Sequence, residues 1–469
     1  MTSRSQPRSK KVEKTSTSWE VLTLGDVGEI ISGGTPSTSV PEYWGDEINW
    51  ISPSDLTGYK KKTIKKGAKS ITKLGLKNSS ARLMPEGSVL FSSRAPIGYV
   101  AIAAEELSTN QGFKSIVPHD FISSEYLYYF LSASKQKAEK VASGTTFKEI
   151  SKSKFAELEI PVPDLSTQKA IVSKLEELFS ELDKGIESLK LAQQQLKVYR
   201  QSVLKWAFEG RLTIGWRKEQ KNLLDTNILF KHIQNAKKLE AHKHGKKLKF
   251  LDEITAEERK NLPAIPKEWI WIKLGDHAFV TKLAGFEFTK YVKYKIEGDV
   301  PVIRAQNVSK SSFIPRNFVY VDRNIMEQLP RSRLYGGEIL MVFVGAGLGN
   351  VGIVPGNHEY FLGPNVAKIA IEGQLNNKYV FHFLTSQIGF ANVTGMSKAT
   401  AQGSISMANI REVSVPLASL EEQREIVNAI ETRFSILDQM EEIISQSLQH
   451  SEVLRQSILN KLLTGNFNY

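Results

Sequence analysis

The sequence predicts an α+β protein that consists of two mixed, β-rich globular domains and two long helices paired as an antiparallel coiled coil. Three observations carry this prediction. Sequence motifs recur in order at a nearly constant offset, short apolar runs are bounded by glycine and proline, and two stretches have heptad spacing. The chain is therefore expected to have an internal pseudo-two-fold repeat, in which each half is a globular domain followed by a long helix.

The repeat is visible as paired motifs. The segment 19–26 (WEVLTLGD) matches 269–276 (WIWIKLGD) at an offset of 250 residues, and Arg-Gln-Ser at 200–202 recurs at 455–457, an offset of 255. Because the offset drifts by only five residues across the unit and the matches keep their order, they indicate a true repeat. The predicted domains are a disordered basic leader (1–18), a first globular domain (19–165), a central helix (166–210), a charged connector (211–262), a second globular domain (263–418) and a distal helix (419–469).

Local patterns predict the elements within each half. Residues 88–91, 99–103 and 338–344 are short apolar runs typical of strands. Residues 124–132 and 377–386 combine aromatic and aliphatic positions at helical spacing. Each globular domain should therefore be β-rich with at least one packed helix.

The central helix has the strongest periodicity, with Ser166 or Thr167 as its predicted cap. Apolar residues spaced by seven predict one line of a coiled-coil seam, and a second line runs beside it through Ile171, Tyr199 and Trp206. The distal helix, starting near Ser419, has a less regular stripe. An alternative is that both helices belong to the core of one bundle. The predicted seam residues include Ile171, Leu175, Leu182, Leu189 and Leu196 in the central helix, and Ile430, Leu437 and Ile444 in the distal helix.

Composition narrows the class of protein. The 62 Lys and Arg exceed the 50 Asp and Glu, which gives a net charge of +12 and suits a polyanionic partner such as nucleic acid. The absence of cysteine excludes disulfides and thiolate metal sites and suits a reducing compartment. No apolar run is long enough to span a membrane, and the leader lacks a signal-peptide core, so we expect a cytoplasmic protein.

Motifs for catalysis are missing. The sequence contains no Pro-Pro, hence no amino-methyltransferase motif, and no P-loop. A glycine-rich stretch at 343–349 follows a predicted strand, but the residues after it cannot open the helix that phosphate binding needs. This stretch and its counterpart at 91–98 are interpreted as hairpin turns, so the chain is expected to be non-catalytic and to bind no metal or cofactor.

Candidate DNA contacts lie in matched loops of the two halves. Lysines without intervening acids are candidates for phosphate contacts, and polar residues after matched strands are candidates for base contacts. The framework around these loops repeats whereas the loop residues differ, as expected if the halves read different sequences. The candidates are Ser52, Ser54, Lys60, Lys61, Lys62, Lys65, Lys66, Arg94, Thr145, Thr146 and Lys148 in the first half, and Lys293, Arg304, Gln306, Asn307, Lys398, Thr400 and Gln402 in the second.

In these motifs the chain resembles the specificity subunits of type I restriction–modification enzymes. The resemblance covers nearly the whole chain from Trp19 onward and rests on the repeated Trp-x4-Leu-Gly-Asp opening, on Ile/Val-Pro before Gln-x-x-Ile-Val, and on Arg-Gln-Ser-Val/Ile-Leu near each helix end. It implies two target-recognition domains that read a bipartite, asymmetric site in double-stranded DNA. It also implies that the helices set the gap between the half-sites and provide a subunit interface, to which the seam residues named above are assigned.

The resemblance further implies partner subunits. Two methyltransferase (modification) subunits would bring S-adenosylmethionine, and restriction (motor-nuclease) subunits would use ATP and Mg, while this chain binds none of these. Two alternatives remain open: a specificity subunit of a methylation-only or phage-defence system, and a coiled-coil scaffold that never binds DNA. A standalone restriction enzyme is disfavoured by the missing motifs.

Overall fold

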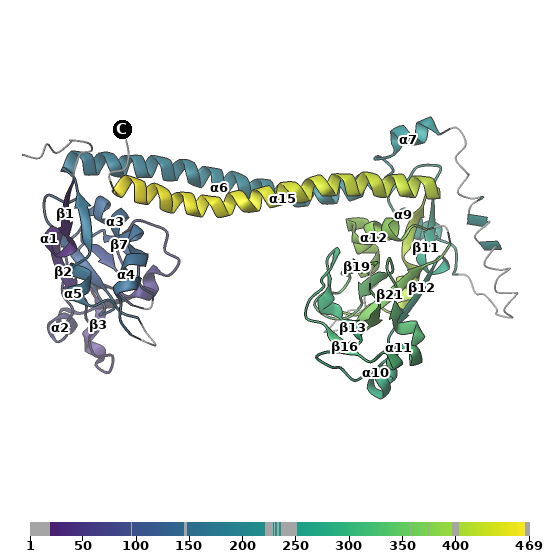
Figure 1. Ribbon diagram of the computed structural model, residues 1–469, viewed down its shortest axis with the longest axis horizontal. Helices are drawn as coiled ribbons and strands as arrows, with labels where there is room; N and C mark the ends of the chain where they lie inside the picture. Colours follow the sequence, from purple (N-terminus) through teal and green to yellow (C-terminus); the bar gives the residue numbers. More distant parts are fainter. Residues whose placement is uncertain are drawn as a thin grey trace, which may run out of the picture. The chain divides into compact units, whose positions relative to one another are not determined.

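The computed structural model describes residues 19–94, 96–144, 148–220, 228, 230–231, 234–235, 251–356, 358–373, 375–395 and 403–464 (Figure 1). The predicted basic leader, the middle of the connector, and the candidates Thr145, Thr146, Lys398, Thr400 and Gln402 lie outside the described residues. Among the described residues, no helix is long and apolar enough to cross a membrane. The chain divides into two compact units, residues 1–190 with 445–469 and residues 191–444.

In unit 1, a five-stranded sheet with the order β2-β9-β6-β7-β4 and a three-stranded sheet with the order β5-β3-β8 form the globular domain. Its further helices pack around these sheets, as predicted for residues 124–132. The elements are β1 (Glu20–Thr23), α1 (Leu24–Val27), β2 (Gly28–Ser32), β3 (Trp44–Ile51), β4 (Thr63–Ile64), β5 (Lys69–Ile71), α2 (Lys73–Lys77), β6 (Val89–Phe91), β7 (Val100–Ala103), β8 (Ser108–Thr109), β9 (Lys114–Pro118), α3 (Ser124–Ala133), α4 (Lys135–Val141), α5 (Lys152–Ala156) and β10 (Glu159–Val162).

Unit 2 repeats this plan with two four-stranded sheets, β12-β21-β18-β19 and β16-β13-β20-β17. The elements are α7 (Ile214–Glu219), α9 (Ala256–Lys260), β11 (Ile270–Lys273), β12 (Ala278–Lys282), α10 (Gly285–Tyr291), β13 (Val300–Ile303), β14 (Val308–Ser309), β15 (Ser312–Phe313), β16 (Val319–Val321), α11 (Arg323–Gln328), β17 (Arg333–Leu334), β18 (Ile339–Val342), β19 (Val351–Ile353), β20 (Tyr360–Leu362), β21 (Val366–Ile371), α12 (Asn377–Thr385), α13 (Gln387–Thr394), α14 (Met407–Glu412) and β22 (Ser414–Leu417).

The repeat in the sequence is confirmed strand by strand. In unit 1, β1 pairs antiparallel with β10, placing Glu20 opposite Val162; in unit 2, β11 pairs with β22 and places Ile270 opposite Leu417. Both predicted hairpins are also confirmed. β6 pairs antiparallel with β7, and β18 with β19, so the glycine-rich stretch 343–349 is a turn between two strands and opens no helix.

The two long helices are α6 (Leu165–Phe208) and α15 (Leu420–Leu463). The predicted cap of α6 is wrong, because Asp164 accepts hydrogen bonds from the Thr167 backbone N–H (3.0 Å) and the Thr167 hydroxyl (2.7 Å). A hydrogen bond from the Ser166 hydroxyl, together with the two from Thr167, holds the pKa of Asp164 well below its usual range. The predicted start of α15 is confirmed, since the Ser419 hydroxyl accepts from the Glu422 N–H at 3.2 Å.

Each unit contains the start of one long helix and the end of the other. In unit 1, Ile171 and Leu175 of α6 lie in one buried cluster with Leu459, Leu462 and Leu463 of α15. In unit 2, the cluster combines the end of α6 with the start of α15 and includes Val203, Leu204, Ala207, Phe208, Ile426, Val427 and Ile430. The segments run antiparallel within each unit, as predicted. Within each unit the globular core is therefore continuous with the seam between the helices. The helices form a coiled coil, as predicted, and their ends also belong to the cores of the globular domains.

Matched arginines tie the paired helices together. In unit 1, Arg455 of α15 forms an ion pair with Asp183 of α6, and its guanidinium lies 4.6 Å from the ring centre of Phe179. In unit 2 the roles are exchanged between the helices: Arg200 of α6 pairs with Asp438 of α15 at 2.6 Å and lies 4.6 Å from the ring centre of Phe434. A cation that satisfies both a carboxylate and an aromatic face is sensitive to register, so each arginine fixes how the helices align locally.

The predicted seam drifts toward the end of α6. Tyr199, predicted on the seam, is 41% exposed, whereas Leu204 and Ala207 are buried. A straight α-helix has 3.6 residues per turn, so a strict seven-residue spacing rotates away from a fixed partner. The core of unit 2 selects the face that meets it.

The predicted connector boundary is also displaced, because both ends of the connector pack into unit 2. Arg217 and Thr213 bond to the buried carboxylate of Glu422, at 2.9 and 2.7 Å, and the Trp269 indole N–H donates to it at 2.8 Å. Further along, Lys273 forms an ion pair with Glu258 of α9 at 2.5 Å. Residues 211–219 and 251–262 are therefore parts of the unit.

The exchange of helix ends predicts where a mutation acts. Leu462→Ala, in α15, is expected to destabilise the first globular domain by about 2–4 kcal/mol, because it opens a cavity in the cluster that contains Ile171 and Leu175. Hydrogen exchange should accelerate in β6 and β9 and stay unchanged in β18 and β21. Leu454→Ala, at a half-exposed position of the same helix, is the matched control. Loss of protection confined to unit 2 would contradict the prediction.

Candidate nucleic-acid interface

Backbone hydrogen bonds bring four loops of unit 1 to one edge of its sheets. Asn110, at the end of β8, donates its N–H to the Ile51 carbonyl at the end of β3 (2.9 Å). Gly34, after β2, donates to the Thr109 carbonyl (2.9 Å), and Ser93, after β6, donates to the Gly112 carbonyl (2.7 Å). Loops that follow β2, β3, β6 and β8 therefore form one surface, which we call the loop edge of unit 1.

A fifth segment joins this edge. The Ile150 N–H donates to the Ser93 carbonyl at 3.0 Å, and Arg94 and Glu149 form an isolated antiparallel bridge. Arg94 comes from the β6–β7 turn and Glu149 from the loop before α5. The base-contact candidates Ser52, Ser54 and Arg94 are thus brought to the same edge, although they are far apart in the sequence.

Unit 2 repeats three of these backbone hydrogen bonds with different side chains. The Gly363 N–H donates to the Ile303 carbonyl (2.9 Å), Phe343 N–H to the Asn365 carbonyl (3.1 Å) and Ile405 N–H to the Phe343 carbonyl (3.0 Å). The bridge that Arg94 and Glu149 make in unit 1 is made here by Val344 and Ser404. The frame is therefore shared, while the chemistry displayed on it differs.

Some of the candidate residues stabilise the loops of this edge through hydrogen bonds within the chain. The hydroxyl of Ser52 donates to Asp55 at 2.6 Å within a 3₁₀ turn over Pro53–Leu56, while Ser54 is exposed. Asn307 is fully buried, and its amide donates to the Ile314 and Arg316 carbonyls at 3.1 and 2.9 Å. The prediction that Asn307 contacts a base edge is corrected by this burial, because its polar atoms are used to fold the loop.

Arg304 and Gln306 lie beside Asn307 and differ from it in exposure. Arg304 is half-buried and Gln306 exposed, and both donate to the carbonyl of Asn317 at 3.0 Å. Asn317 itself adopts a left-handed conformation, with φ of 55°. Lys293, on the loop after α10, is exposed.

The lysine run of unit 1 contains no acid in sequence but meets acids in space. Lys62 pairs with Glu176 of α6 at 2.6 Å, Lys65 with Glu105 at 2.8 Å and Lys66 with Asp46 at 3.1 Å. Lys60, Lys61 and Lys148 are exposed and have no ion pair among the described residues. Because the pairs of Lys65 and Lys66 are solvent-exposed, phosphate could replace their carboxylates at little cost.

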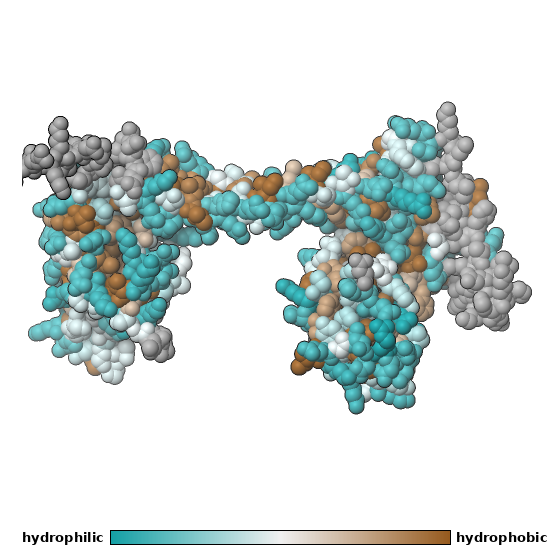
Figure 2. Space-filling view, in the orientation of Figure 1, coloured by the Kyte–Doolittle hydropathy of each residue, from teal (hydrophilic) through white to brown (hydrophobic). Residues whose placement is uncertain are grey.

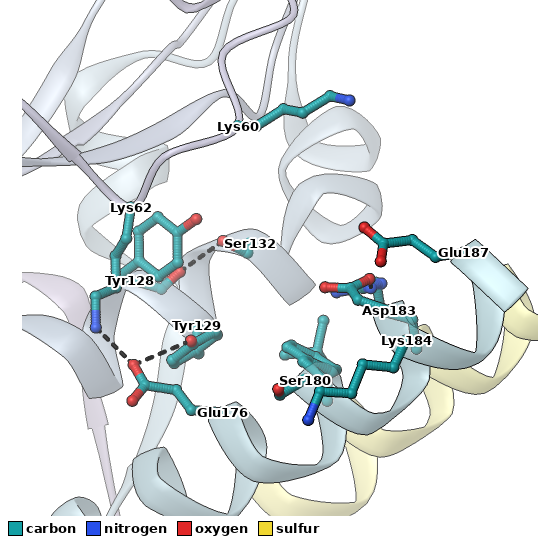
Figure 3. A pocket seen from close by; sticks show the side chains of 13 residues that line it. Lys60, Lys62, Tyr128, Tyr129, Ser132, Glu176, Ser180, Asp183, Lys184 and Glu187 are labelled. Atoms are coloured by element: carbon teal, nitrogen blue, oxygen red, sulfur yellow. Dashed lines mark hydrogen bonds and ion pairs between the residues drawn. The ribbon is translucent and has the colours of Figure 1, made fainter.

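Lys60 and Lys62 also line a cleft of about 580 Å³ between the globular domain and the helices of unit 1 (Figure 3). Glu176 joins two other lining residues of the cleft, because its carboxylate accepts a hydrogen bond from Lys62 and, at 3.4 Å, one from the Tyr129 hydroxyl. Burial raises the pKa of Tyr129, which keeps the phenol protonated as the donor. Lys62 therefore joins the segment before β4 to α6, a role that the predicted phosphate contact did not include.

In unit 2, a glutamate of α15 makes contacts equivalent to those of Glu176, with different partner residues. Glu431 of α15 pairs with Lys378 at 2.7 Å and lies 4.0 Å from the Nε2 atom of His382. Burial lowers the pKa of His382 to about 4, and the neighbouring Glu431 only partly opposes this. His382 is thus held neutral where unit 1 has a tyrosine.

The seam residues assigned to a subunit interface are placed differently by the structure. Ile171, Leu175 and Ile430 are fully buried within the chain, and Leu437 and Ile444 are 3% and 8% exposed. Leu182, Leu189 and Leu196 are half-buried. The assignment is corrected because the buried residues are occupied by the chain's own core and seam.

Other apolar residues of the helices are exposed, and Figure 2 shows hydrophobic residues on the outer surface of the helix pair. Ile436, Met440 and Ile443 follow helical spacing on α15 in unit 2, and Leu191 and Val198 lie seven residues apart on α6. Val198 is 67% and Ile443 61% exposed. Sequence reasoning placed Met440 on the seam, where the structure exposes it, and missed the other four because it assigned the more regular stripe to the interface.

The loop edge also contains polar residues that the sequence analysis did not select. The Thr35 hydroxyl donates to the exposed side chain of Gln111, and Asn110 lies next to it. The polar run 108–112, directly before the apolar residues of β9, was the available signal. Among the described residues, no group of His, Asp or Glu has the arrangement of a metal site.

The comparison with known proteins agrees with this architecture. The family model of the type I restriction–modification DNA specificity domain matches residues 17–190 and 254–450, so the chain belongs to this family. The chain is 24% identical to the EcoKI specificity subunit of Escherichia coli K12, over 95% of this chain and 89% of that protein. It is 44% identical to the MjaIX specificity subunit of Methanocaldococcus jannaschii, but this match spans only 34% of the chain and 37% of that protein.

Solved structures share the fold. The HsdS subunit from Thermoanaerobacter tengcongensis aligns over 96% of this chain and 97% of its own length, with a TM-score of 0.57 and 16% identity. A chain from a study of complex assembly and conformational transition in a type I system aligns over 96% of this chain and 99% of its own length, with a TM-score of 0.64 and 17% identity. The predicted fold class is thereby confirmed.

The neutral His382 predicts a pH dependence. The unfolded histidine titrates near its ordinary value of 6.5 and the folded one near 4, so unit 2 should lose about 3 kcal/mol of stability as the pH falls from about 6.5 to 4. Denaturant unfolding at a series of pH values measures this. His382→Tyr, which restores the residue of unit 1, should flatten the profile in that window. An equally steep profile in the variant would contradict the prediction.

Proposed function

We propose that this chain recognises DNA as the specificity subunit of a type I restriction–modification complex, and that each globular domain reads one half of a bipartite, asymmetric site. One observation carries the proposal: the matched loops of the two units share three backbone hydrogen bonds and one backbone bridge but carry different side chains. Two domains that recognise different half-sites require a similar backbone and different side chains on the surface that faces DNA. The net charge of +12 supports a polyanionic partner.

Catalysis in this proposal belongs to other subunits. The chain lacks the amino-methyltransferase and P-loop motifs in its sequence. We therefore infer that two methyltransferase subunits supply S-adenosylmethionine chemistry and that restriction subunits supply ATP- and Mg-dependent cleavage. A methylation-only complex would use the same specificity subunit without the restriction subunits.

The methylome of cells carrying this chain and its methyltransferase tests the proposal. We expect one motif made of two different half-sites separated by an unspecified gap. In the same cells, loss of this chain should abolish methylation at the motif. A continuous palindrome would rule out two independent readers, and a purified complex without salt-dependent affinity for duplex DNA would favour the scaffold alternative.

The exposed apolar residues of the helices are the proposed contact for a methyltransferase subunit. Val198→Asp is expected to weaken co-purification of the methyltransferase at least tenfold, because it places a charge in an apolar interface. Thermal stability of the isolated chain should be unchanged, since the side chain is 67% exposed. Gln194→Asp, at another exposed position on α6, is the matched control. Equal retention of the methyltransferase by both variants would exclude this surface.

A further inference from the structure

We infer that Arg94 reads a guanine in the half-site of unit 1 and that Glu149 is the positioning residue that orients its guanidinium. The inference rests on the proposed function and assigns a base and an atom to one contact. It is drawn from the backbone bridge that both units share. In unit 1 the bridge joins Arg94 and Glu149, which also form an ion pair, whereas in unit 2 it joins the uncharged Val344 and Ser404.

Arg94 is available for a planar, two-bond contact in a way that Arg304 and Lys62 are not. Its side chain is 36% exposed, and its guanidinium makes no hydrogen bond to any residue that the structure describes. The nearest carboxylate oxygen, on Glu149, is 3.6 Å away. By contrast, Arg304 of unit 2 donates to a backbone carbonyl and Lys62 is held by Glu176. The planar N–H fork of Arg94 is therefore free to form two parallel bonds.

The backbone around Arg94 is nevertheless fixed, because Arg94 forms a backbone bridge with Glu149. The Ser93 N–H bonds to the Gly112 carbonyl, which fixes the backbone before Arg94. A fixed backbone below an unbonded guanidinium suits a specific base contact, because the backbone loses no further conformational entropy on binding.

Glu149 contacts two cations at once. Its carboxylate lies 3.6 Å from the Arg94 guanidinium and 3.4 Å from the Lys114 amine, and the Lys114 side chain is only 9% exposed. Lys114 therefore anchors Glu149 from the protein side, and Glu149 faces Arg94 from the solvent side. The carboxylate can accept from one edge of the guanidinium and leave the other edge for DNA.

Fold stability does not explain the pair. The Arg94 and Glu149 side chains are 36% and 38% exposed, and an ion pair of that exposure contributes little to stability. Unit 2 makes the same backbone bridge with Val344 and Ser404, so the fold does not require the charges. The charges are instead specific to the surface displayed by unit 1.

The base follows from donor geometry. In the major groove, guanine alone presents two adjacent acceptors, O6 and N7, which match the two N–H groups of an arginine fork. Adenine presents one acceptor beside a donor, and thymine a single acceptor. A lysine at this position could supply charge but could not select guanine in this way.

The test uses the whole specificity–methyltransferase complex and duplexes that carry its methylome motif. Replacing the relevant guanine with 7-deazaguanine removes the N7 acceptor. This should lower the DNA affinity of the complex that contains the wild-type chain about tenfold. Arg94→Ala should lose about ten- to a hundredfold in discrimination at one G·C position, and 7-deazaguanine there should cause no further loss. Arg94→Lys should lose the same discrimination while keeping the salt dependence of binding, because the charge remains.

Glu149→Gln tests positioning. It should reduce discrimination at the same G·C position by about three- to tenfold, since the fork remains but loses its orienting charge. The other half-site is the internal control, and its recognition should be unchanged in every variant. A merely structural role for Glu149 would weaken binding to all duplexes equally and leave the 7-deazaguanine effect intact.

The outcomes separate this inference from the proposed function. If the methylome motif is bipartite but Arg94→Ala leaves it unchanged, or relaxes an A·T position, the guanine assignment is overturned and the proposed function stands. Equal weakening at both half-sites would likewise overturn it, because that result identifies a phosphate contact. If no bipartite motif is found, the proposed function itself fails.

Discussion

The structure depends on an exchange of helix ends between the two halves of the sequence. The end of α15 completes the core beside the first globular domain, and the end of α6 completes the core of the second. Phe208 shows the consequence, since its ring lies 5.3 Å from Tyr379 and 5.2 Å from Phe383 of α12. Neither globular domain therefore buries its apolar surface with residues of its own half alone.

Buried polar contacts also join the start of each long helix to the globular domain of its own half. Gln168 of α6 accepts from the Ser123 N–H and donates to the Phe121 and Pro163 carbonyls, and Gln423 of α15 accepts from the Asn376 N–H at 2.8 Å. Both glutamines are fully buried. Apolar packing alone would tolerate small displacements, whereas a buried amide with matched partners does not. Equivalent buried glutamines thus fix the start of each long helix against its own domain.

In the candidate interface, the backbone is shared by the two units and the side chains differ. Backbone hydrogen bonds define the loop edge, and three of them recur in unit 2 although the side chains differ. Side chains such as Arg94 and Val344 then vary on equivalent positions without disturbing the bridges. A recognition surface built this way can change its ligand preference while its fold and its helix contacts stay constant.

The sequence by itself determined the repeat, the two long helices, the hairpins and the likeness to a known family, because motif order and apolar period are properties of the chain alone. It also selected Arg94 and the matched loops. Only the tertiary structure decided which candidates are buried: Asn307 folds its own loop, Ile171 and Leu175 lie in a core, and Lys62 pairs with an acid more than a hundred residues away. Tertiary structure also decided that each unit combines both helices. Burial and ion pairing depend on which distant segments meet, and no local pattern contains that information.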